Sequence, residues 1–86
     1  MRFTVFWSRG SQAELAREWT ESSDRAALTA AAALIDRVLS QDPLDCGEAR
    51  DEDFRIMFAD PLGVEFHVNE PDRRVIVISV WRTKRE

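Results

Sequence analysis

Residues 64–81 read VEFHVNEPDRRVIVISVW, and this stretch decides the fold because it contains two apolar runs on either side of a turn sequence. Apolar and polar side chains alternate in VEFHVN, and RVIVISVW is rich in β-branched residues, as is typical of β-strands. The intervening EPDR has proline at its second position, where proline favours a β-turn. We therefore predict a hairpin with a two-residue turn, in which His67 pairs with Ile76 and Glu65 with Ile78.

This register assigns each side chain to one face of the sheet. The face toward the core is predicted to hold Val64, Phe66, Val68, Val75, Val77, Ser79 and Trp81. The opposite, open face is predicted to hold Glu65, His67, Asn69, Ile76, Ile78, Val80 and Arg82. Ile76, Ile78 and Val80 would form an apolar strip in solvent, and no other segment of the chain is left to cover it. We therefore expect a partner protein to bind this strip.

The N-terminal half predicts one strand followed by two helices. Apolar residues alternate in FTVFW, and SQAE at residues 11–14 is a capping box, which predicts a helix that begins at Ser11. A second helix, capped at Ser23, carries apolar side chains at helical spacing in RAALTAAAALIDRVL and ends before Pro43. Because the connection between them is short, the two helices should form an antiparallel hairpin.

Residues 54–58, FRIMF, predict a further strand, and the length of the DPLG turn that follows decides which of its side chains face the core. An even turn would bury Arg55 under the helices, whereas an odd turn would expose it on the open face. Burying an unpaired guanidinium costs more free energy than lengthening a turn. We therefore predict the odd turn, with Arg55 near His67.

The predicted element order is strand, helix, helix, strand, strand, strand within a single domain, residues 1–86. This order favours an α+β fold in which a helical hairpin packs on one face of an antiparallel sheet.

Composition excludes several classes of protein. The formal net charge is −4, which argues against nonspecific nucleic-acid binding, although residues 73–86 contain five basic residues and one glutamate, a local charge of +4. No apolar run approaches the roughly 20 residues of a membrane span. The single cysteine, Cys46, cannot form an internal disulfide, so we expect a cytoplasmic protein. With one histidine and no ligand-spaced carboxylates, we expect neither a metal site nor a cofactor.

The element order and several short motifs resemble the RelE/ParE superfamily, the toxins of bacterial type II toxin–antitoxin systems. The matching segments are FTVFWS, AELAREW, AALTAAAALIDRVLSQDPLDCGEAR and RRVIVISVWR, which together span nearly the whole chain. The resemblance implies a toxin whose sheet is covered by an antitoxin protein. The expected antitoxin-binding residues are Ile76, Ile78 and Val80.

RelE-like members bind the ribosome and cleave messenger RNA, so the resemblance also implies a set of catalytic residues. Attack of the ribose 2′-oxygen on phosphate needs a base, a group that stabilises the phosphorane oxygens, and an acid for the leaving oxygen. Glu65 would be the base and His67 the acid. Arg55 and Arg82 would stabilise the phosphorane. The residues expected to contact RNA phosphates are Arg50, Lys84 and Arg85.

Two readings from different classes of protein remain. In the first, the chain is a RelE-like mRNA endonuclease that acts at the ribosome. In the second, it is a ParE-like inhibitor of DNA gyrase, or an inactive member that only binds its antitoxin. The arginine, glutamate and histidine residues on the open face favour the first reading. The negative net charge and the absence of tyrosine favour the second, and His67 then has no catalytic role.

Overall fold

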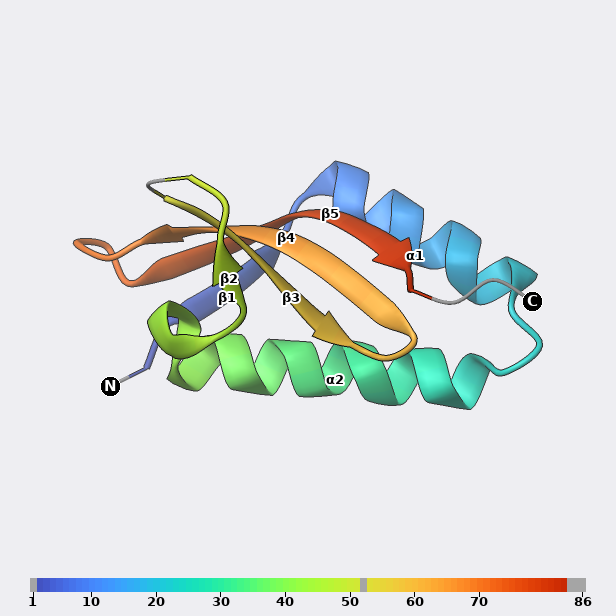
Figure 1. The fold of residues 1–86 in the computed structure, drawn as a ribbon. Helices are drawn as coiled ribbons and strands as arrows, with labels where there is room; N and C mark the ends of the chain where they lie inside the picture. Colours follow the sequence, from blue (N-terminus) through green and yellow to red (C-terminus); the bar gives the residue numbers. More distant parts are fainter. Residues whose placement is uncertain (1, 52, 84–86) are drawn as a thin grey trace.

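The computed structural model describes residues 2–51 and 53–83, which form a five-stranded sheet and two α-helices (Figure 1). The strands are β1 (Thr4–Trp7), β2 (Glu48–Ala49), β3 (Phe54–Ala59), β4 (Leu62–Asn69) and β5 (Arg74–Arg82). The helices are α1 (Arg9–Glu21) and α2 (Arg25–Gln41), and a 3₁₀ turn, η1 (Pro43–Asp45), follows α2. The predicted order of elements is confirmed, and β2 is an additional short strand.

The sheet has the strand order β1-β5-β4-β3-β2 and is mixed rather than wholly antiparallel. β1 runs parallel to β5, whereas the other neighbouring strands pair antiparallel. The helical hairpin explains why β1 is parallel to β5, because it returns the chain to the end of the sheet where β1 begins. There the Phe3 amide donates to Ser40 O at 2.7 Å. β3 and β5 therefore run in the same direction as β1.

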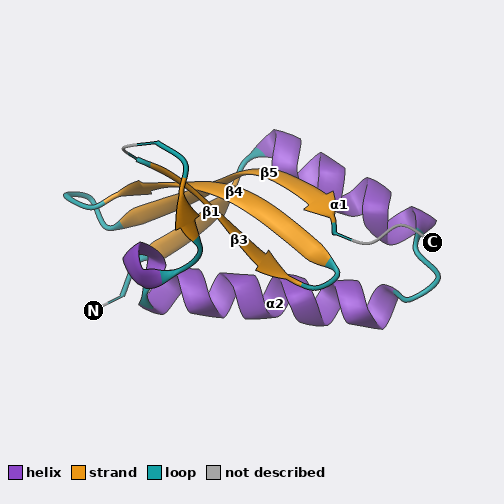
Figure 2. Cartoon of the chain, viewed as in Figure 1, coloured by secondary structure: helices purple, strands orange, loops and turns teal. Residues whose placement is uncertain are grey.

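Helix α2 covers one face of the sheet (Figure 2). Its buried side chains lie at helical spacing, as predicted: Leu28, Ala31, Ile35 and Leu39. They form one core cluster with fully buried side chains of the β4–β5 hairpin, Val64, Phe66, Val75 and Val77. Full burial of one such aliphatic or aromatic side chain contributes about 1.5–3 kcal/mol. The predicted core side of the hairpin is thus confirmed near its turn.

Helix α1 lies along the edge of β5 (Figure 1). Three hydrogen bonds hold the chain there: the Ser8 amide donates to Val77 O, the Ser8 hydroxyl to Ile78 O, and the Val80 amide to Glu14 Oε1. The last of these measures 3.0 Å. Because β1 ends at Trp7, α1 supplies the partners that β1 no longer provides to the second half of β5.

The predicted helix starts are each displaced. The N-cap of α1 is Ser8 rather than Ser11, and its hydroxyl accepts from the Ser11 amide at 3.1 Å. The Glu14 carboxylate binds β5 and so does not complete a capping box. The N-cap of α2 is Asp24, one residue after the predicted Ser23.

A β-bulge at Ile78 shifts the register between β4 and β5. His67 pairs with Ile76, as predicted, but Glu65 pairs with Ser79 rather than with Ile78. Ile78 is therefore an extra residue in β5. Every residue after it faces the side opposite to the one that strict alternation predicts.

The predictions for the end of β5 are consequently wrong. Val80 and Arg82, expected on the open face, pair with buried residues of β4 on the helix side, and Val80 itself is buried. Ser79 and Trp81, expected in the core, lie on the open side. The bulge therefore exchanges two pairs of side chains between the faces of the sheet.

The turn between β3 and β4 also has the parity opposite to the prediction. Ala59 pairs with Leu62, so the turn is even and Arg55 lies on the helix side. The β3 side chains on the open face are instead Phe54, Ile56 and Phe58. The guanidinium is nevertheless paired, since its Nε donates to Cys46 O at 3.0 Å and its Nη2 to Gly47 O at 3.4 Å. These main-chain carbonyls remove the penalty on which the prediction depended.

We predict that Glu14→Ala destabilises the protein by about 1–3 kcal/mol, because the partly buried Val80 amide loses its acceptor. Glu14→Gln keeps a side-chain oxygen and is expected to lose less. Urea denaturation measures the free energy of unfolding, and hydrogen exchange of the Val80 amide reports the local effect. Equal stability of Glu14→Ala and wild type would show that the hydrogen bond from the Val80 amide to Glu14 does not stabilise the β5 edge.

Candidate functional site

The sheet face opposite α2 is the open face, and its side chains form four rows across the strands. The first row, nearest the β4–β5 turn, contains Thr4, Arg74 and Asn69. The second row contains Phe6, Ile76, His67 and Phe54. The third row contains Ser79, Glu65, Ile56 and Glu48. The fourth row contains Trp81, Gly63 and Phe58. The bulge residue Ile78 is exposed between the second and third rows.

The second and fourth rows are mainly apolar and reach solvent. Phe58 is 63% exposed and Phe6 is 48% exposed, high values for phenylalanine. In the fourth row the rings of Phe58 and Trp81 meet edge to face, with centroids 6.2 Å apart. Gly63 makes room for this pair, because a Cβ there would lie 2.6 Å from Trp81 Nε1. The open face is thus an aromatic and aliphatic surface.

The third row carries the negative charge of the open face. Glu65 and Glu48 lie on either side of Ile56. The Glu65 side chain is half-buried and has no hydrogen bond or ion pair within residues 2–51 and 53–83. In the neighbouring second row, the His67 ring packs against Phe54 with centroids 5.0 Å apart.

The four residues predicted as catalytic are divided between the two sides of the sheet. Glu65 and His67 lie on the open face, two residues apart on β4. Arg55 and Arg82 lie on the helix side. Arg82 Nε is buried without a hydrogen bond and lies 3.8 Å from Glu18 Oε1 of α1. The open face therefore does not bring the two arginines to Glu65 and His67.

One cavity does join two of the four predicted catalytic residues. Arg55 and His67 line a cavity of about 470 Å³ at the end of the sheet, together with Asn69, Asp53 and Glu70. With His67 neutral, one arginine and two carboxylates give this lining a charge of −1. Electrostatic attraction therefore favours phosphate binding less at this lining than at one with excess positive charge.

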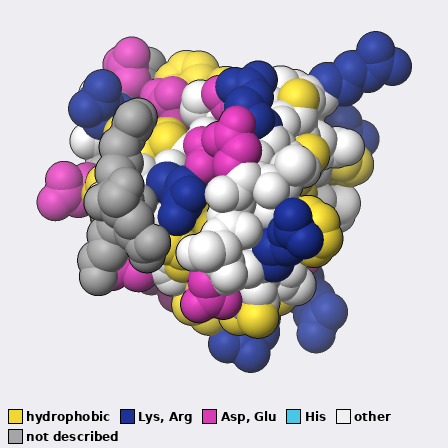
Figure 3. All heavy atoms as spheres, turned by 90° about the vertical axis from the view of Figure 1, so that its right-hand side faces the viewer, with side chains coloured by type: hydrophobic (Ala, Val, Ile, Leu, Met, Phe, Trp, Pro, Cys, Tyr) yellow, Lys and Arg dark blue, Asp and Glu magenta, His cyan; other side chains and the backbone are white. Residues whose placement is uncertain are grey.

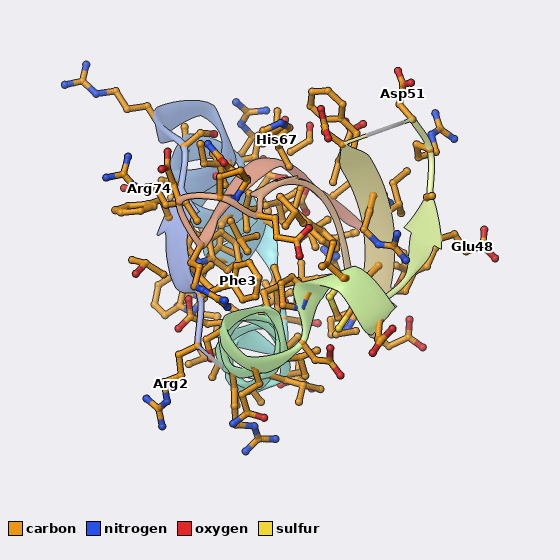
Figure 4. All side chains as sticks on the ribbon, turned by 90° about the vertical axis from the view of Figure 1, so that its left-hand side faces the viewer. Arg2, Phe3, Glu48, Asp51, His67 and Arg74 are labelled. Carbon is orange, nitrogen blue, oxygen red and sulfur yellow. The ribbon has the colours of Figure 1, made fainter. Side chains whose placement is uncertain are left out.

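The residues predicted to bind phosphate form no group in the structure. Arg50 is exposed between β2 and β3, and Lys84 and Arg85 lie outside the described residues. Viewed along the sheet, Glu48 and Asp51 lie on one side and Arg74 on the other (Figure 4). At the end of the molecule near the α1–α2 turn, acidic, neutral and apolar surface separates the visible basic side chains (Figure 3). Neither view shows a continuous basic patch over the described part of the chain.

A groove that the sequence did not predict lies between α1, α2 and β1. It encloses about 880 Å³ and is lined by small side chains of α2, among them Ala32 and Ala33, and by Trp19 of α1. Trp19 is 43% exposed, and its Nε1 donates to Thr29 Oγ1 at 3.2 Å. These alanines leave little side-chain bulk on this side of α2, so a neighbouring helix could approach it closely. Because α1 follows the β5 edge instead, the space beside the alanines stays open.

Cys46 is a half-buried thiol held by a hydrogen bond to the main chain. Its Sγ donates to Asp42 O at 2.8 Å. Burial raises the pKa of the Cys46 thiol and the carboxylates of Asp42 and Asp45 add to this, while Arg55 lowers it. A raised pKa keeps the sulfur protonated, whereas the thiolate is the nucleophile and metal ligand.

Two further features are absent from residues 2–51 and 53–83, the described part of the chain. No group of three or more His, Cys, Asp or Glu side chains is placed to hold a metal ion there. No helix in this part of the chain is long and apolar enough to cross a membrane.

The chain matches no protein-family profile and no curated protein sequence. Its fold, however, occurs in solved structures. A chain of the toxin–antitoxin complex RelBE2 from Mycobacterium tuberculosis matches it with a TM-score of 0.78 and 17% identity, over 98% of this chain and 95% of that one. A chain of the chromosomal ParDE system from P. aeruginosa matches with a TM-score of 0.65 and 17% identity, over 96% and 98%.

A third similar structure is TrmO from Pseudomonas aeruginosa. It matches with a TM-score of 0.61 and 22% identity over 93% of this chain, but the matched region is only 35% of the TrmO chain. At these identities the comparisons show the fold alone. The predicted RelE/ParE-like α+β fold is confirmed.

We predict that Gly47→Ala destabilises the protein by about 1–3 kcal/mol, because Gly47 occupies a backbone conformation that alanine disfavours. Its φ is 65°, and a Cβ there would overlap the Ile56 carbonyl group. Gly10→Ala is the matched control, since the nearest atom, Ser8 Oγ, is 3.9 Å from the added carbon. Urea unfolding of both variants measures the difference. An equal effect of the two substitutions would contradict the prediction.

Proposed function

We propose that this chain is the toxin subunit of a bacterial type II toxin–antitoxin system and that its partner is an antitoxin protein. The observation that carries the proposal is the match to a RelBE2 chain over nearly the full length of both chains. The apolar second and fourth rows of the open face support it, because contiguous exposed apolar surface marks protein interaction sites. Of the residues predicted to bind the antitoxin, Ile76 and Ile78 reach this surface, whereas Val80 is buried.

Expression of this chain alone in a bacterial host is expected to stop growth, because no antitoxin then covers the toxin. Co-expression of the reading frame that flanks its gene should restore growth. Colony-forming units after induction measure the effect, and a gene with a stop codon at Trp7 controls for the burden of expression. Unimpaired growth while the soluble, folded chain accumulates would contradict the toxin assignment.

Among the toxin activities, we propose inhibition of a protein target such as DNA gyrase rather than cleavage of mRNA at the ribosome. Catalysis of cleavage needs positive charge beside the reacting phosphate. Arg82 faces α1, away from Glu65 and His67. The open face instead offers apolar side chains, which suit the surface of a protein.

Messenger RNA cleavage is the second candidate activity, and one observation favours it. Arg55 and His67 line the same cavity, so a phosphate there would meet a cation and an imidazole. In this reading His67 protonates the leaving oxygen and Arg55 stabilises the phosphorane.

Two assays of the purified chain distinguish these activities. We expect inhibition of gyrase supercoiling, and intact mRNA when primer extension follows a reconstituted translation reaction. Should mRNA be cleaved, His67→Ala would have to slow cleavage by about 10²-fold or more for His67 to be the acid. Arg82→Ala is the matched control, because its side chain faces α1 rather than the cavity. Cleavage that shows this pattern would overturn the proposed protein target.

A further inference from the structure

The acidic third row of the open face lies between the two apolar rows. Glu65 and Glu48 flank Ile56 in this row, while Phe6 and Ile76 lie on one side of it and the Phe58–Trp81 pair on the other. A half-buried carboxylate that has no partner among residues 2–51 and 53–83 is stabilised most by a cation that arrives with apolar surroundings. Glu65 is in this position.

The same row excludes one class of partner. A nucleic acid would bring phosphates toward Glu65 and Glu48, and these like charges repel. Among the described strand residues of the open face, only Arg74 is basic. It lies in the first row, at the margin, with its guanidinium 5.9 Å from the Phe6 ring centroid. A protein segment, by contrast, supplies apolar side chains and a cation together.

The groove between α1 and α2 is the other apolar surface, and it lacks this selectivity. Its acidic side chain, Asp36, already accepts a hydrogen bond from Trp7 Nε1 at 3.2 Å. The Asp36 carboxylate is also exposed, so an ion pair with a partner contributes little there. Glu65 on the open face is half-buried, and a charged hydrogen bond to it selects more strongly among partner sequences.

We infer that the open face binds an amphipathic helix of a partner protein, and that a lysine or arginine of this helix pairs with Glu65. Under the proposed function, on which this identification rests, the helix belongs to the antitoxin. Arginine suits the site especially well, because its planar guanidinium can donate two hydrogen bonds to a partly desolvated carboxylate.

The spacing of the rows fixes the sequence pattern of the partner. Successive rows lie two residues apart on β4, which is about 6.6–6.8 Å. Residues four apart on an α-helix rise by about 6 Å. A helix that runs along β4 therefore places an apolar residue on the second row at position i, a basic residue on the third at i+4, and an apolar residue on the fourth at i+8.

A displayed library of amphipathic helices tests the inference, with the full chain as bait. The library keeps leucine at i and i+8 and allows every residue at i+4. Wild type is expected to enrich lysine and arginine at i+4, and Glu65→Lys to enrich aspartate and glutamate. The Kd of the best basic helix should rise about tenfold or more on Glu65→Lys. Glu21→Lys, the same charge change at an exposed position of α1, is the matched control and should keep the wild-type preference.

Three results would each overturn the inference. The first is that wild type enriches no basic residue at i+4, and the second is that Glu65→Lys keeps the wild-type preference. The third is that the bound helix shifts the backbone amide NMR signals of the α1–α2 groove rather than those of β4 and β5. If circular dichroism shows that Glu65→Lys is unfolded, Glu65→Gln takes its place and must lose the preference for basic residues. The growth assay is independent, so a toxin that arrests growth without this helix preference would refute only the inference.

Discussion

The hydrogen-bonding edge of β5 is the constraint on which the rest of the structure depends. β5 pairs with β4 along its length, but on its other side β1 reaches only Val77. The remaining edge takes its partners from the chain that follows β1: the Ser8 hydroxyl donates to Ile78 O, and Glu14 accepts from the Val80 amide. This requirement places α1 at the sheet edge. α2 is then the helix that covers the sheet face (Figure 2). The groove between the two helices stays open.

The bulge in the same strand decides the chemistry of the open face. One extra residue, Ile78, turns Arg82 toward α1 and brings Trp81 to the open side, where it packs against Phe58. The even β3–β4 turn similarly removes Arg55 from that face. Two local changes of parity therefore convert a predicted surface with two arginines into one that is apolar and acidic. Each change is small in the backbone and large in its consequence for the possible partners.

Sequence patterns predicted the elements whose side chains repeat with a clear period. The apolar stripe of α2 and the hairpin register next to the β4–β5 turn are both confirmed. Alternation cannot locate a bulge, because VIVISV is apolar at both parities and reads equally well with or without an extra residue. The position of Arg55 depended on carbonyls of Cys46 and Gly47, which no short-range pattern brings to the strand. The site predictions therefore failed where one distant contact or one inserted residue reversed the parity.

The fold by itself does not choose between a toxin and another use of the same architecture, because a similar fold makes up about a third of TrmO. The chemistry of the surface distinguishes between these uses. A face that binds RNA by its backbone needs positive charge, whereas this one sets Glu65 and Glu48 between phenylalanine, isoleucine and tryptophan. The net charge of −4 acts in the same direction, since it weakens long-range attraction of polyanions. Glu65 is half-buried and has no ion pair among the described residues. A partner that supplies a cation to Glu65 and also buries the apolar rows beside it meets both demands of this surface, and a protein segment can do so.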